Sequence, residues 1–204
     1  MNGNDVMKMV ENWEKMKEFL YPILLPEKRV VTEKDVSKRF LDLEVCIVIR
    51  FTETSVPIHV TREMLVKWNI SEEHLYEQAM KNLLEEKYVF CSLEELVERM
   101  VGEKLEIKEA PIMILTNDMS WYGAAEMLNL PLLSEYASEK ACDLYILPSS
   151  VHEVLMIEVI QEVQADELKA LVMNVNQEKV PPEEQLSDRV YYFSRKSGKI
   201  SIAV

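Results

Sequence analysis

The chain has 204 residues, of which 48% are hydrophobic and 29% are charged, and its formal net charge at pH 7 is −13. A chain of this length buries roughly 70% of its unfolded surface, and its hydrophobic content argues against a disordered protein. The length predicts a single domain over residues 1–204. The negative charge repels a phosphate backbone, so nucleic acid is not expected as a partner.

The cysteines, histidines and glycines carry none of the common site motifs. Cys46, Cys91 and Cys142 are far apart and lack CxxC spacing, so free thiols are expected and no metal ligand set is predicted. Four glycines are too few and too scattered for a Walker loop, GxGxxG or GxSxG, and no cofactor is predicted. The sequence has no secretory signal and no run of about 18 apolar residues, which predicts a cytoplasmic protein that does not enter a membrane.

The first half of the chain predicts a helix followed by strands. Apolar residues at three- and four-residue intervals predict an N-terminal helix over about residues 5–20. Residues 21–26 contain two prolines and predict an edge strand. Residues 27–39 are charged and predict a connector. Apolar and polar residues alternate cleanly over residues 41–51, which predicts a strand with one core face. A returning strand at 56–60 completes an antiparallel hairpin across residues 52–55.

Three capping signals mark the helices that follow. Thr61 and Ser71 precede helices that together extend to residue 87, and Ser92 with Glu95 forms a capping box for a helix that ends near Gly102.

The second half predicts more hairpins than strand-helix-strand units. The predicted strands lie at 111–115, 144–147 and 151–157, and a final hairpin pairs 190–193 with 200–204. The predicted helices lie around 123–128, which breaks at 129–131, at 132–141, and at 166–176 with Asp166 as its cap. The loop of the final hairpin is expected to place Gly198 in the left-handed region. The sequence therefore predicts an α+β fold, with a mainly antiparallel sheet built from hairpins and helices packed on its faces.

One turn concentrates polar chemistry. The bend between the strands at 144–147 and 151–157 holds the candidate site residues Ser149, Ser150, His152 and Glu153. Asn117 and Asp188 are two further candidates that the fold could bring to this turn. A zinc-protease motif is excluded because position 156, four residues after His152, is methionine.

A structural interpretation of the same turn competes with catalysis. Adjacent strand residues point to opposite faces, so His152 and Glu153 are not expected to cooperate. The serine hydroxyls would satisfy the turn, and Glu153 would need an Arg or Lys partner, a polar donor from the turn or a wet position at the end of the sheet. If Glu153 is a paired carboxylate, replacing it with glutamine is expected to weaken the fold.

The chain resembles a bacterial family catalogued as domain of unknown function 5688 over about residues 13–192. The segments that carry the resemblance occur in one order, at residues 40–43, 64–76, 114–117, 123–125, 143–154 and 180–192. In this family Asn is frequent at the position of Tyr122 and Gly at the position of Asn69. The resemblance implies no activity and no catalytic residue.

These observations favour a non-enzymatic binding or interaction domain that recognises a protein or small-molecule partner. The alternative is a small-molecule hydrolase or transferase that uses the cluster at residues 149–153. The sequence predicts no oligomeric state.

Overall fold

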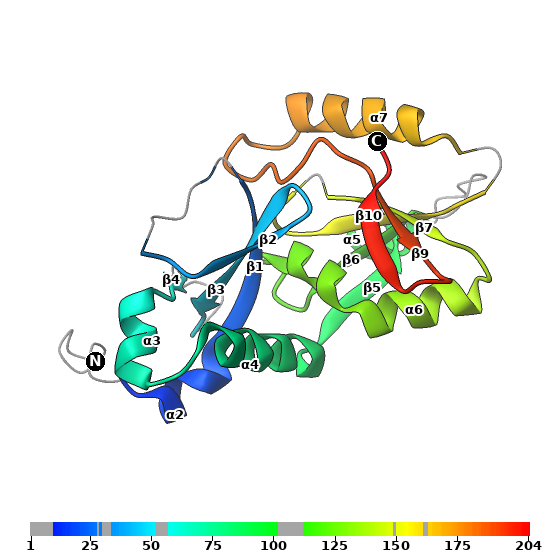
Figure 1. The fold of residues 1–204 in the computed structure, drawn as a ribbon. Coiled ribbons are helices and arrows are strands. Elements are labelled where there is room, and N and C mark those ends of the chain that lie inside the picture. Colours follow the sequence, from blue (N-terminus) through cyan, green and yellow to red (C-terminus); the bar gives the residue numbers. More distant parts are fainter. Residues whose placement is uncertain are drawn as a thin grey trace. The chain divides into compact units, whose positions relative to one another are not determined.

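The computed structural model describes residues 10–27, 29, 34–51, 57–101, 112–148, 150–160 and 163–204. The chain divides into two compact units, residues 1–86 and 87–204, which are described separately below (Figure 1). Both units combine antiparallel strands with helices, so the predicted α+β class is confirmed. The single-domain expectation stays a prediction.

A small antiparallel sheet forms the centre of the first unit. Its strands are β1 (Leu20–Pro26), β2 (Ser37–Phe40), β3 (Leu43–Ile49) and β4 (Ile58–His59), and the other three all pair with β3. The edge position predicted for residues 21–26 is confirmed. The connector predicted over residues 27–39 was wrong at its end, because β2 begins at Ser37. The alternation predicted one core face for β3, but Cys46 and Val48 on its other face are fully buried as well.

The helices of the first unit begin where their caps predict. Thr61 caps α3 (Arg62–Trp68) and Ser71 caps α4 (Glu72–Glu85), each by accepting a main-chain N–H three residues later. The continuous N-terminal helix predicted over residues 5–20 was wrong in the described part. Asn12 has extended dihedral angles and caps a single turn, α2 (Trp13–Met16), which passes through a 3₁₀ turn, η1 (Lys17–Phe19), into β1; residues 1–9 lie outside the described residues.

The second unit is built on a six-stranded antiparallel sheet. The strands follow the order β10-β9-β7-β8-β6-β5. Their bounds are β5 (Tyr88–Ser92), β6 (Met113–Asn117), β7 (Leu144–Leu147), β8 (Val154–Glu158), β9 (Tyr191–Ser194) and β10 (Lys199–Ile202). The β9–β10 turn places Gly198 at a φ of 64°, as predicted.

Among the residues that the structure describes, four helical segments accompany this sheet. They are α5 (Leu93–Val101), the 3₁₀ helix η2 (Gly123–Leu128), α6 (Leu130–Glu139) and α7 (Ala165–Glu178). Ser92 and Glu95 form the predicted capping box, since each side chain accepts the main-chain N–H of the other. The predicted cap at Asp166 was wrong, because α7 already begins at Ala165, after Gln164.

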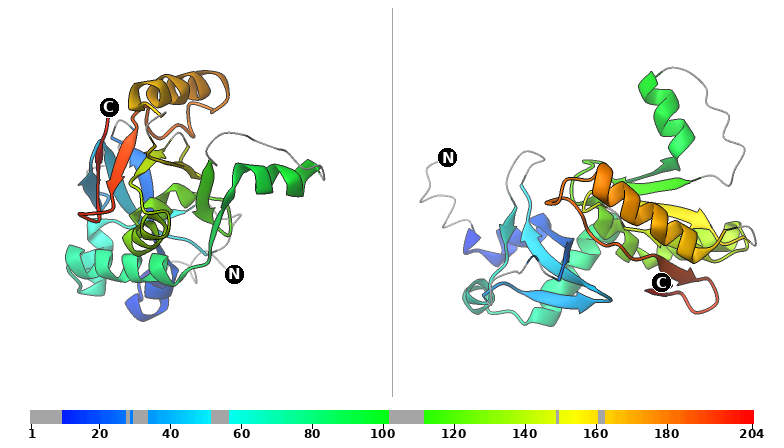
Figure 2. Two further views of the ribbon diagram at one scale, coloured as in Figure 1. Left: turned by 90° about the vertical axis from the view of Figure 1, so that its right-hand side faces the viewer. Right: turned by 90° about the horizontal axis from the view of Figure 1, so that it is seen from above.

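The sheet separates α7 from α6, which lie on its opposite faces (Figure 1). In the view from above, α7 lies over the sheet (Figure 2). Because side chains alternate along a strand, Leu155 and Ile157 of β8 face α7. The core on this face contains Leu147, Ile157, Leu168, Val172 and Val190.

Candidate functional site

The described part of the candidate turn, Pro148 and residues 150–153, is a loop rather than the start of a strand. β7 ends at Leu147 and β8 begins only at Val154. The loop is held to a later segment, because Val151 N–H donates to the carbonyl of Glu184 at 2.8 Å and Ser150 forms an isolated bridge with Gln185. The strand predicted from residue 151 was therefore wrong over 151–153, and strand alternation does not separate His152 from Glu153.

Ser150 is buried and its hydroxyl group is used inside the loop. Its Oγ accepts the main-chain N–H of His152 at 3.0 Å and donates a hydrogen bond to the Glu153 carboxylate. The side chain is only 4% exposed. The bonds described for this hydroxyl lead to a backbone amide and to the carboxylate of Glu153, and neither leads to the imidazole of His152. Ser149, the other predicted hydroxyl, lies outside the described residues.

His152 is anchored by hydrogen bonds to neighbouring segments. Its Nδ1 accepts the main-chain N–H of Tyr122 at 3.2 Å, and its carbonyl accepts the Thr116 hydroxyl at 2.7 Å. Its Nε2 lies 3.8 Å from a carboxylate oxygen of Glu184. With Nδ1 accepting, the neutral ring carries its proton on Nε2, directed to the Glu184 side.

Glu153 lies in a poorly solvated position. Burial raises the pKa of its carboxyl above the ordinary value of 4.5, while His152 and the Ser150 hydrogen bond act in the opposite direction and Glu184 adds to the rise. Of the partners that the sequence left open, a polar donor from the turn, Ser150, is described. The charged form of Glu153 is therefore destabilised by burial more than His152 and the Ser150 hydrogen bond stabilise it.

Asn117 and Asp188 bind other parts of the unit. Asn117 is fully buried, and its amide side chain both accepts from and donates to the main chain of Trp121. Asp188 accepts a hydrogen bond from the side chain of Asn176 at 2.8 Å. The structure therefore describes a cluster of Ser150, His152 and Glu153. Asn117 fixes Trp121, the residue before the Tyr122 N–H that binds His152, and Asp188 contacts Asn176.

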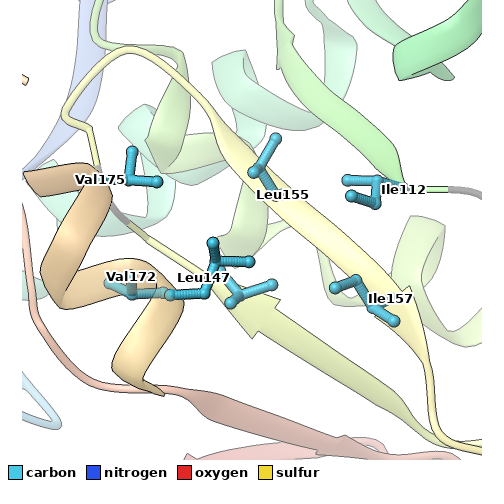
Figure 3. A pocket seen from close by; sticks show the side chains of 7 residues that line it. Ile112, Leu147, Leu155, Ile157, Val172 and Val175 are labelled. Atoms are coloured by element: carbon cyan, nitrogen blue, oxygen red, sulfur yellow. The ribbon is translucent and has the colours of Figure 1, made fainter. Parts of the chain in front are cut away.

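A second candidate site, which the sequence did not predict, is a groove between α7 and the sheet. We call it the α7 groove. Its volume is about 40 Å³, and its lining consists of seven aliphatic side chains from Ile112, Leu147, Leu155, Ile157, Leu171, Val172 and Val175. Figure 3 shows Val172 and Val175 on the α7 side and Ile112 across β8 from them.

The α7 groove opens to solvent at Leu171. This side chain is 49% exposed although it lines the groove, whereas Val172 beside it is 3% exposed. The apolar stripe of residues 168, 171, 172 and 175 is visible in the sequence at helical spacing. The groove was missed because the same stripe is expected of any helix packed on a core.

Two further features concern the described residues. They contain no group of three His, Cys, Asp or Glu side chains that could hold a metal ion. The helices that the structure describes include none with the length and apolar character needed to cross a membrane.

Comparison with known proteins gives one match. The sequence model of a family described as "Family of unknown function (DUF5688)" matches residues 2–195, which confirms the resemblance and extends it toward both ends of the chain. Neither a curated protein nor a solved structure matches the chain.

Proposed function

Since the chain belongs to the DUF5688 family, whose description names no activity, we propose from its own structure that it is a non-enzymatic cytoplasmic binding domain. The α7 groove receives apolar groups of a binding partner. The observation that carries this proposal is an open groove with an aliphatic lining in which Leu171 remains half exposed. Removing apolar surface from water contributes about 25 cal/mol for each Å², against which the entropic cost of association is set.

The arrangement at Ser150 argues against a serine–histidine mechanism. A hydrolase or transferase of that kind at residues 149–153, the alternative function, would need a serine hydroxyl hydrogen-bonded to an imidazole nitrogen. The bonds described for Ser150 and for Nδ1 of His152 go to other groups. The three cysteines are free thiols in the structure, which agrees with a reducing compartment.

Two exposed side chains on α7 allow a controlled test. Leu171 and Met173 are both 49% exposed, but only Leu171 lines the groove. We propose to immobilise the wild-type chain and the variants Leu171→Asn and Met173→Asn and to quantify what each retains from a native lysate of the source cells. Both substitutions place the same residue on the same helix, so their effects on helix stability are matched.

The expected result is that wild type and Met173→Asn retain the same molecules and that Leu171→Asn loses them. Equal retention by the two variants would show that the groove is not the binding site. Retention of a metabolite that disappears when Ser150 is replaced by alanine, but not with Leu171→Asn, would favour the enzymatic alternative.

A further inference from the structure

We propose that the partner in the α7 groove is a protein segment folded as a basic amphipathic helix. This inference rests on the proposed binding function and adds the chemical class of the partner. It follows from the size of the groove, from its lining and from the charges along its rim.

The size of the groove argues for a side chain of a larger partner. Its volume is about 40 Å³, whereas an apolar cavity that encloses benzene has roughly 150 Å³. The groove therefore accommodates the end of an aliphatic side chain and not a whole drug-sized molecule. An anchor side chain that enters a small apolar pocket is a common feature of protein interfaces.

The lining argues in the same direction. Sites for small metabolites combine an apolar wall with a few polar groups that fix the orientation of the ligand. The seven side chains that line the α7 groove are all aliphatic. Orientation of the partner must therefore come from groups outside the groove.

Two carboxylates along the rim supply such groups. Glu167 precedes Leu171 by four residues, and Glu178 follows Val175 by three, so both lie on the helix face that borders the groove. Both residues are exposed. A partner that presents Lys or Arg beside its apolar anchors would complement this rim, and the net charge of −13 would attract it from a distance.

The spacing of the lining residues on α7 favours a helical partner. Leu171 and Val175 are one turn apart on α7, so the apolar surface repeats along the helix axis at the spacing of helical turns. An amphipathic helix presents anchors at positions i, i+3, i+4 and i+7, which match this repeat.

Three fluorescent peptides of 14 residues test the proposal by anisotropy. The first has leucines at i, i+3, i+4 and i+7 spacing and lysines elsewhere, the second has glutamates in place of the lysines, and the third has the composition of the first with leucines at alternate positions. The first peptide is expected to bind wild-type protein at least about ten times more tightly than the other two. Leu171→Asn should abolish this preference, and Met173→Asn should preserve it.

The rim is tested with charge-matched double variants. Glu167→Gln with Glu178→Gln should weaken binding of the first peptide roughly three- to tenfold at low salt. Glu135→Gln with Glu139→Gln changes the net charge equally but lies on exposed positions of α6, and it should have little effect.

Each other outcome overturns part of the argument. If the lysate experiment shows a partner that depends on Leu171 but the three peptides bind alike, the binding function stands and the basic helical partner is wrong. If neither experiment depends on Leu171, the binding function fails with it. If light scattering shows that wild type self-associates and Leu171→Asn is monomeric, the occupant is a second copy of the chain, which also contradicts the proposal.

Discussion

The main-chain N–H of Tyr122 donates a hydrogen bond to Nδ1 of His152, 3.2 Å away. The bond joins the start of η2 to the loop before β8, two segments 30 residues apart in the sequence. Tyr122 itself has a φ of 52°, in the left-handed region that Asn and Gly adopt more readily.

Replacing His152 with phenylalanine should lower the free energy of unfolding by about 1–3 kcal/mol, because the Tyr122 N–H loses its acceptor. His152→Asn should recover at least half of this loss, since its side-chain oxygen can take the place of Nδ1. Urea unfolding followed by tryptophan fluorescence measures both values. Equal losses in the two variants would mean that the hydrogen bond contributes nothing measurable.

Glu153→Gln should raise stability at neutral pH. Burial raises the pKa of Glu153 above 4.5 in the folded chain, so the folded state binds this proton more tightly than the unfolded state does. The wild type therefore loses stability as pH rises from about 4.5 through the folded pKa, by about 1.4 kcal/mol for each unit by which the two pKa values differ. The glutamine variant lacks this loss.

Unfolding curves of wild type and Glu153→Gln at pH 4, 5.5 and 7 test this sign. The variant should gain on the wild type as pH rises and show no advantage at pH 4. A variant that is less stable at pH 7 would restore the expectation from the sequence alone, which assumed a paired carboxylate at this position.

Ala141→Gly should stabilise the second unit by about 0.5–1 kcal/mol. Ala141 follows α6 with a φ of 57°, and the N–H of Cys142 donates to the carbonyl of Ala137, which is the hydrogen bond of a helix end that favours glycine. Ala170→Gly is the control, because Ala170 is exposed in the interior of α7 and its replacement should cost about 1 kcal/mol. Thermal unfolding should move in opposite directions for the two variants, and a shared direction would contradict the prediction.

Gly123→Ala should be severely destabilising, by at least about 3 kcal/mol. A Cβ atom at this position would lie 2.1 Å from Oγ1 of Thr116 and 2.6 Å from two main-chain atoms, the nitrogen of Asn117 and the oxygen of His152. A Cβ atom at Gly198 would lie 4.0 Å from Oγ of Ser134, an ordinary contact distance, so Gly198→Ala should cost only about 1 kcal/mol through its left-handed φ. Comparable melting temperatures for the two variants would show that η2 can move away from the loop.

Local signals in the sequence predicted the elements that depend on neighbouring residues. The caps at Thr61, Ser71 and Ser92 and the turn at Gly198 were correct because each depends on side chains or dihedral angles within about four residues. These signals locate helix starts and tight turns. They do not decide which strands pair.

Elements stabilised by distant partners were harder to predict. β2 has two exposed cationic residues in four positions and is a strand because it pairs with β3. The strand expected from Val151 is instead a loop bound to residues 184–187, which lie more than 30 positions away. The α7 groove depends in the same way on the packing of a helix against strands that precede it in the chain.

The order of strands in the second unit has a consequence for synthesis. β7 pairs with β8 on one side and with β9 on the other, yet β9 is made more than 40 residues after β7. Until the ribosome has released residues 191–194, β7 is an open edge that could pair with another nascent chain. Asp143, immediately before β7, later accepts hydrogen bonds from the Tyr192 hydroxyl and the Arg195 N–H. These two bonds fasten β9 beside the start of β7 once it has been made.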